Sequence, residues 1–287
     1  MARWPDGPTF NRYNFGRRMP TPTQATSERF GYGWVTGGRP APVTAPIEYH
    51  LHGMQTALGA PPFHGRVLDA GCGEGIDLAS VSLSGTVSAV GVELSNGGIA
   101  ATSARIEGLA RARLVQGNIL SLPLASGAFD GAYSYGVVHH TVDPEGAVRE
   151  IVRVLKPGAM LLLYVYEDFS GRSIAWRMAL SAVNGLRGRV AGMSPANIRR
   201  FCAVIAPLIY ATCTWPSRQF RFARRWPYPA TQNPTLKSLV PDLYDRFAAP
   251  IERRYSQTGA RRLAEQAGCR VHRSAFLRGW AVWAEKS

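Results

Sequence analysis

Three glycines follow an apolar run near residue 70, in the order Asp69-Ala70-Gly71-Cys72-Gly73-Glu74-Gly75. The run 66–70 predicts a buried strand, and residues 76–83 predict a helix. Glycine lets a backbone approach a ligand closely and adopt φ values that a side chain would forbid. The helix that follows directs free N–H groups at the same ligand. This turn therefore indicates a cofactor site, although its order G-x-G-x-G departs from the G-x-G-x-x-G typical of dinucleotide-binding enzymes.

Polar residues close the next two strands. Glu93 ends the strand 87–92 and stands 20 residues after Gly73, where a carboxylate can accept both hydroxyls of a ribose. Leu94 comes next, and we expect it to pack on one face of an adenine. Asn118 and Ile119 follow the strand 112–116, and the Asn118 side-chain carbonyl can accept a hydrogen bond from an adenine amine. This spacing favours a cofactor that contains a nucleoside.

Two adjacent histidines, His139 and His140, come just after the strand 129–135. They belong to the carboxyl end of a parallel sheet, where such folds bind ligands. Histidine is the side chain best suited to accept a proton near neutral pH. A structural role is the alternative, in which one ring packs beside the cofactor or orders the loop 141–143.

The elements around these residues alternate regularly. Strands are predicted at 66–70, 87–92, 112–116, 129–135 and 160–166, and helices at 46–58, 76–83, 99–108 and 144–155. This alternation is typical of an α/β fold with a mostly parallel sheet and right-handed crossovers. The alternation of strands and helices stops after Asp168 and resumes with a helix at 256–267 and strands at 269–276 and 279–285. We therefore divide the chain into an arm or lid (1–45), a core (46–168), a basic, mainly helical cap insertion (169–255) and the end of the core (256–287).

The net charge of +14 is concentrated in the insertion. Residues 170–262 hold 16 Lys/Arg and 3 Asp/Glu, whereas residues 69–169 hold 6 and 11. Such an asymmetry suggests an anionic partner for the insertion, and an arginine-rich surface without a partner is the alternative. The four cysteines lack paired spacing, which argues against disulfides and a zinc site. With neither a signal peptide nor an apolar run long enough for a membrane span, we expect a cytoplasmic protein.

The segment 67–165 resembles the core of the class I S-adenosylmethionine-dependent methyltransferases, in the small-molecule branch called type 11. The likeness lies in VLDAGCGEG, GVELS, FDGAYSYGVVHHTVDP and AVREIVRVLKPGAMLLLYV, in that order. It implies a Rossmann-like sheet of seven strands with one antiparallel edge strand, and S-adenosylmethionine as cofactor. Asn118 stands where the family usually has Asp, which keeps an acceptor but loses its charge. The expected cofactor residues are Asp69, Gly71, Cys72, Gly73, Glu93, Leu94, Asn118, Ile119 and the backbone near Ser134.

Methyl transfer requires a nucleophile about 3 Å from the methyl carbon, a pocket poor in water and often a base. In similar metal-independent O-methyltransferases a histidine at this position is the base. The resemblance therefore makes His139 or His140 the candidate base and Asp168 its orienting carboxylate, with Glu167 a weaker candidate. Oxygen is the expected acceptor atom, nitrogen and carbon remain open, and no metal is expected.

The segments outside the core are expected to contact the substrate. Tyr32 and Trp34 belong to an aromatic stretch of the arm that can fold over the pocket and exclude water. Arg221 belongs to the run 218–226, which interleaves cations with aromatic residues and can hold an anionic group while stacking a ring. The apolar run 201–215 is expected to be buried, as an inner cap helix or against a hydrophobic substrate.

The sequence is compatible with three classes of substrate. A small molecule, natural-product-like or anionic, is favoured. A lipid or membrane-bound substrate is the second class, since a basic insertion can lie on an anionic membrane. A nucleic acid is the third, and it is disfavoured because the sequence shows no known RNA-binding module. The sequence does not fix an oligomeric state.

Overall fold

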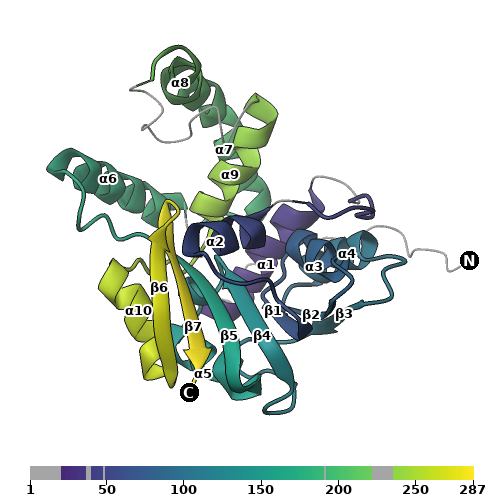
Figure 1. Ribbon diagram of the computed structural model, residues 1–287. Coiled ribbons are helices and arrows are strands. Elements are labelled where there is room, and N and C mark those ends of the chain that lie inside the picture. Colours follow the sequence, from purple (N-terminus) through teal and green to yellow (C-terminus); the bar gives the residue numbers. More distant parts are fainter. Residues whose placement is uncertain (1–20, 37–39, 48, 191, 222–234) are drawn as a thin grey trace, which may run out of the picture.

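The computed structural model describes residues 21–36, 40–47, 49–190, 192–221 and 235–287 (Figure 1). Seven strands form one sheet in the order β3-β2-β1-β4-β5-β7-β6. The Rossmann-like fold class is thereby confirmed. β7 is antiparallel to both of its neighbours and lies one strand in from the edge that β6 forms. The strands are β1 (Gly65–Ala70), β2 (Val87–Glu93), β3 (Ala112–Gln116), β4 (Phe129–Tyr135), β5 (Leu155–Tyr166), β6 (Cys269–Phe276) and β7 (Gly279–Lys286).

Helices cover both faces of the sheet and extend beyond its carboxyl end. The core helices are α2 (His50–Leu58), α3 (Ile76–Ser82), α4 (Asn96–Arg105), α5 (Pro144–Val154) and α10 (Gln257–Gln266), with a short 3-10 helix, η1 (Val138–His140). The cap holds α6 (Ile174–Val190), α7 (Pro195–Ile209), a π-helical turn η2 (Tyr210–Thr214), α8 (Pro216–Gln219) and α9 (Leu236–Ala248). None of the helices in the described ranges is both long and apolar enough to cross a membrane.

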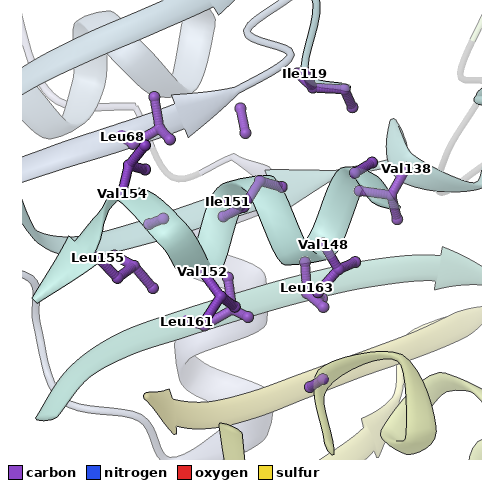
Figure 2. Close-up of a cluster of buried hydrophobic side chains, with 14 of the residues drawn as sticks. Leu68, Ile119, Val138, Val148, Ile151, Val152, Val154, Leu155, Leu161 and Leu163 are labelled. Carbon is purple, nitrogen blue, oxygen red and sulfur yellow. The ribbon is translucent and has the colours of Figure 1, made fainter. Parts of the chain in front are cut away.

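The main core lies between α5, α10 and the sheet. Val148, Ile151 and Val152 of α5 point at the strands, where Leu161 and Leu163 of β5 meet them (Figure 2). Asp143 caps this helix by accepting a hydrogen bond from Gly146 N, and Pro144 occupies its first turn. Burying each of these aliphatic side chains contributes about 1.5–3 kcal/mol. This packing fixes the loop at the carboxyl end of β4, which carries the two histidines, and the end of β5 beside it.

The cap has a hydrophobic core of its own. α7 and α9 pack together through Ile198 and Cys202 on one helix and Leu239 and Leu243 on the other. Figure 1 shows these helices beyond the carboxyl ends of the parallel strands, which is where an insertion after β5 must lie. The cap therefore covers the edge of the sheet at which ligands bind in α/β folds.

The N-terminal arm forms a helix, α1 (Pro22–Val35), that joins the cap to the core. Gly31 lies so close to the start of α4 that a Cβ on Gly97 would be 2.0 Å from the Gly31 carbonyl oxygen. On its other side, the Tyr244 hydroxyl of α9 donates to the Arg29 carbonyl. Residues 1–20 and 37–39 of the predicted arm lie outside the described residues.

One expectation for the cap is wrong. The run 201–215 is not buried all round, because Val204, Leu208 and Trp215 are 78%, 67% and 52% exposed. Only the side of α7 that faces α9 is covered, since no further layer of described residues lies beyond the cap. Residues 222–226, the second half of the predicted cation–aromatic run, lie outside the described residues.

The contact between α1 and α4 predicts the effect of a single methyl group. Gly97→Ala should displace α1, because the new Cβ meets backbone and not a flexible side chain. We expect limited proteolysis to cut α1 at least tenfold faster. Gly53→Ala in α2 is the control, because a Cβ there meets nothing within 4 Å. Equal protection of α1 in both variants would contradict this close packing.

Candidate active site

A cavity of about 1410 Å³ lies between the carboxyl ends of the strands and the cap. At one end it is lined by the glycine turn and the loops after β2 and β3. At the other end it is lined by β4, β5 and cap helix α6, and residues of α9 also line the cavity. A single space thus connects the predicted cofactor residues with His140. The predicted cofactor residues that line it are Asp69, Gly71, Cys72, Gly73, Glu93, Leu94, Asn118 and Ile119.

The glycine turn requires glycine for two separate reasons. Gly71 and Gly73 have φ values of 89° and 55°, which L side chains rarely adopt. A Cβ on Gly71 would also lie 2.5 Å from the Val137 side chain, and one on Gly73 would lie 3.2 Å from the Trp34 ring. The turn therefore passes close under α1, and its bare backbone forms the floor of the cavity.

Glu93 is the buried carboxylate that holds this end of the site together. Its Oε2 accepts from Gly73 N at 3.1 Å, and its Oε1 accepts from the N and Oγ of Ser95 at 2.8 and 2.6 Å. Ser95 in turn caps α4. Burial raises the pKa of Glu93, and these three hydrogen bonds oppose the rise because they favour the ionised form.

Carboxylates gather at the cofactor end of the cavity. Burial raises the pKa of Asp69 well above its usual range, Asp77 adds to the rise, and a hydrogen bond from Tyr133 opposes it. Asp245 of α9 was not predicted from the sequence. Its pKa is raised to about 7 by burial, with further contributions from Asp242 and Glu74. A cationic ligand bound beside these carboxylates would favour their ionised form.

The two histidines occupy different positions. His140 lines the cavity, and its Nδ1 donates to the Ile251 carbonyl at 2.7 Å, which leaves Nε2 as an acceptor. His139 is fully buried behind it, with its ring tilted against those of His140 and Tyr166, and does not line the cavity. Neither ring nitrogen of His139 has a hydrogen-bond partner among the described residues. The structure thus brings only His140 to the cavity.

The pattern of the methyltransferase domain family matches residues 68–163, which hold the glycine turn, Glu93 and both histidines. Residues 68–163 form a class I S-adenosylmethionine-dependent methyltransferase domain.

The relatives of this methyltransferase domain differ in their acceptors. The chain is 34% identical over 118 residues to the 24-methylenesterol C-methyltransferase 2 of Oryza sativa, covering 40% of this chain and 32% of the rice protein. It is 36% identical over 99 residues to an O-methyltransferase of Pyrenophora dematioidea, covering 33% and 37%. The chain thus spans about a third of the length of these relatives. A solved structure of a methyltransferase from Aquifex aeolicus is also similar, with 15% identity, a TM-score of 0.45 and coverage of 77% of this chain and 82% of that one.

The geometry of the methyltransferase domain fits S-adenosylmethionine. The bare backbone of Gly71 and Gly73 provides the close approach that the cofactor needs, and the buried carboxylates suit a ligand with sulfonium and ammonium charges. The Asn118 Oδ1 already accepts from Leu120 N at 2.9 Å, so it has one lone pair left for an adenine amine. Ser134 requires a correction. Its buried hydroxyl donates to the Ala70 carbonyl, and its neighbours Tyr133 and Tyr135 line the cavity instead.

Asp168 does not contact either histidine in the methyltransferase domain. Its Oδ1 accepts from the N and Oγ of Ser170, which turns it into the loop after β5, and it does not line the cavity. These contacts do not support an orienting role. Glu167 does line the cavity, but Arg172 binds it through both carboxylate oxygens at 2.7 and 3.1 Å. The group that orients His140 is the Ile251 carbonyl, and backbone carbonyls leave no signal in a sequence.

The substrate end of the cavity has an aromatic wall. Tyr135 stacks between His50 and Tyr164, with ring centroids 3.9 and 4.2 Å away, and Tyr166 meets Tyr164 edge to face. Phe30 of α1 closes the wall beside His140, at 5.2 Å between ring centroids. The alternation of side chains along β4 and β5 directs these tyrosines into the cavity. They were not among the residues predicted from the sequence. The wall can hold an apolar or aromatic substrate beside the His140 ring.

Four arginines line the same end of the cavity, namely Arg172, Arg246, Arg254 and Arg278. Arg254 is held by Glu252 at 2.6 Å and also donates to the Glu167 carbonyl. Arg187 binds the same oxygen of the Glu252 carboxylate, Oε1, at 2.8 Å. Two arginines therefore share one buried carboxylate beside His140, which leaves this region with net positive charge.

The predicted substrate residues need revision. Trp34 lines the cavity, but over Gly73 at its cofactor end. Tyr32 packs against Tyr244 in the cap core and does not line the cavity. Arg221 is exposed just after α8 and does not line it either. The inward arginines come instead from the loop before α6, the last turn of α9, the loop after α9 and the turn between β6 and β7.

Loss of the Glu93 charge should weaken cofactor binding. Glu93→Gln keeps the shape but loses a charge-assisted acceptor, so S-adenosylhomocysteine should bind roughly 1.5–3 kcal/mol more weakly in calorimetric titration. Glu265→Gln, on the exposed side of α10, is the control and should bind with unchanged affinity. Equal affinity in the two folded variants would reject the assignment.

Binding of S-adenosylmethionine should depend on the ionisation of Asp245. A cationic ligand favours the ionised carboxylate, so affinity should rise with pH, by up to about tenfold per unit below the Asp245 pKa, and level off above it. Titrations at pH 6 and pH 8 should show this rise in the native protein and not in Asp245→Asn. Asp143→Asn, which keeps its helix cap, should behave like the native protein. A flat profile for the native protein would place the cation elsewhere.

Proposed function

We propose that this protein is a methyltransferase that transfers a methyl group from S-adenosylmethionine to an oxygen of a small anionic molecule with an apolar or aromatic body. The observation that carries the proposal is the continuous cavity, with carboxylates at its cofactor end and aromatic rings, arginines and His140 at the other. When bound, S-adenosylmethionine supplies an electrophilic methyl carbon on a sulfonium. The protein must then position the acceptor, exclude water and remove a proton.

His140 is the proposed base. Its Nδ1–H is fixed on the Ile251 carbonyl, so the lone pair of Nε2 remains available to accept the proton of an acceptor hydroxyl. Burial lowers the pKa of His140, although the Ile251 carbonyl and Glu252 oppose the shift. The ring is therefore neutral at pH 7 and competent as a base. When it becomes charged, Glu252 lies close enough to stabilise it.

The arginines that line the cavity bind the anionic group of the proposed substrate. Arg254 is held rigidly by Glu252 and by the Glu167 carbonyl, so little side-chain freedom is lost when it binds a ligand. Guanidinium groups bind carboxylates and phosphates through paired hydrogen bonds. The Tyr164 and Tyr166 rings beside it provide apolar surface for the body of the substrate. The cap and α1 cover this chamber, which strengthens the charge interactions inside it.

Substitution of the two histidines should separate catalysis from packing. His140→Gln should lower the rate by about 10²–10⁴ with cofactor affinity retained, whereas His139→Gln should cost less than tenfold. The measurement is transfer of a labelled methyl group to a panel of hydroxyaromatic acids and their neutral amides. In the native protein the rate should be flat near neutral pH and fall in acid, once His140 takes up a proton.

Three outcomes would contradict parts of this proposal. If neither substitution costs tenfold, positioning alone carries the reaction and His140 is not a base. If the amides are methylated as fast as the acids, the arginines do not select an anion. If no acceptor in the panel is labelled although S-adenosylhomocysteine binds, the substrate class is wrong but the cofactor assignment stands.

A further inference from the structure

The outer part of the cap has no acidic residues. Between Phe169 and Pro241 the sequence holds eleven Lys/Arg and no Asp or Glu. Three of these cations, Arg177, Arg189 and Arg200, are exposed on α6 and α7, and none forms an ion pair with a described residue. Exposed arginines without an ion-pair partner on these two helices favour an anionic partner.

The same helices expose apolar side chains at helical spacing. On α7, Val204 and Leu208 stand four residues apart and share one face, and Trp215 is exposed just after the π-helical turn η2. On α6, Ile174 and Met178 are 71% and 67% exposed and also stand four residues apart. In Figure 1 both helices extend away from the sheet, at the end of the molecule farthest from β3. Exposed aliphatic residues combined with arginine are typical of helices that lie in a membrane interface.

The inner faces of these helices line the cavity. Trp176, Leu180 and Val183 of α6 face into it, as do Ile209 and Cys213 at the end of α7 and in η2. The apolar surface outside the cap and the apolar wall of the substrate chamber are therefore two sides of the same helices.

We propose that the outer face of α6, α7 and α8 docks on the surface of an anionic lipid bilayer, with its helices parallel to the membrane plane. Val204, Leu208 and Trp215 enter the interface, and the exposed arginines contact lipid phosphates. This inference rests on the cap surface and is independent of the proposed reaction, because it needs neither the cofactor nor His140.

The chemistry of this face favours lipid over the other partners it can attract. Single-stranded nucleic acid is bound by stacking on several aromatic rings between phosphate contacts, whereas four of the five apolar residues named on this face are aliphatic and only Trp215 among them offers a π surface. A second copy of this chain would place the unpaired arginines of one cap against those of the other, which repel. A bilayer with anionic headgroups satisfies the aliphatic and the cationic side chains together.

The test is flotation of the full chain with phosphatidylcholine vesicles, with and without 30% phosphatidylglycerol. We expect association with the anionic vesicles only, weakening as salt rises. Arg177→Gln/Arg189→Gln/Arg200→Gln should weaken the partition roughly fivefold for each charge and so on the order of a hundredfold in all. Val204→Ser/Leu208→Ser should weaken it at least tenfold.

Matched controls carry the same changes on the core. Arg111→Gln/Arg149→Gln/Arg270→Gln removes the same net charge, and Ile47→Ser/Val142→Ser removes exposed apolar residues away from the cap. Both should float like the native protein. S-adenosylhomocysteine affinity checks that each variant is folded. If a variant fails to fold, the response of the native protein to lipid composition and salt still tests whether the chain binds an anionic membrane.

Several results would overturn the proposal. Equal flotation with neutral vesicles, no flotation with anionic ones, or equal losses in cap and core variants would each reject this face as a membrane surface. Tight binding of a uridine 20-mer without vesicle association would assign the face to nucleic acid. Concentration-dependent self-association that Val204→Ser/Leu208→Ser abolishes would assign it to a second copy of the chain.

Discussion

The carboxylate of Glu93 fixes the geometry on which the rest of the site depends. It ties the glycine turn after β1 to the start of α4, through Gly73 N on one side and Ser95 on the other. A buried carboxylate with three donors is stable only while all three remain in place, because losing one leaves charge uncompensated in a low-dielectric environment. The start of α4 then receives α1 at the close contact between Gly31 and Gly97. Helix α1 is therefore positioned by Glu93, the same carboxylate that holds the glycine turn at the cofactor end.

Charge is divided along the cavity in a way that suits two unlike ligands. Asp69, Glu93 and Asp245 gather at the cofactor end, and burial, with smaller contributions from neighbouring acids, raises the pKa values of Asp69 and Asp245. Arg254 and its neighbours make the substrate end positive. In the proposed reaction, a sulfonium cofactor would favour the ionised carboxylates at one end, and an anionic acceptor would balance the arginines at the other. Both ligands would then meet near His140, whose pKa is lowered by burial.

The fold was more predictable than the site because its signals are local. The strands at 112–116, 129–135 and 269–276 have the predicted bounds, since apolar runs and turn residues define them. β5 begins at Leu155 instead of Met160, because Lys156-Pro157-Gly158 continues directly into the strand after ending the helix. The predicted burial of the apolar run 201–215 was wrong because composition does not reveal whether a second layer of the protein covers a helix.

The site depended on long-range contacts that spacing cannot show. The predicted cofactor residues line one cavity because they lie at or just after the carboxyl ends of strands of the same sheet, so topology brings them together. Choosing between His139 and His140 required the 3-10 turn at 138–140 and the Ile251 carbonyl, which lies 111 residues away. Asp245 had a weak signal of its own, since it and Asp242 are the first acids after a long acid-free stretch. In a segment whose charged residues are almost all basic, an acid indicates a specific role and not a general contribution to surface charge.

The cap combines two constraints that are usually met by separate elements. α6 must keep Trp176 and Val183 against the substrate chamber, yet its opposite face carries Ile174 and Met178 with no described residue covering them. A helix that is apolar on both sides is costly in water unless its outer side has its own partner. Seated at a lipid interface, the outer side would lose that cost while the inner side kept its role. The chamber would then open beside the membrane surface, where an amphipathic anion partitions with its charge in the headgroups and its apolar body below. An acceptor of that kind can pass from the interface to the aromatic wall without exposing its apolar part to bulk water, which links the position of the cap to the chemistry of the cavity beneath it.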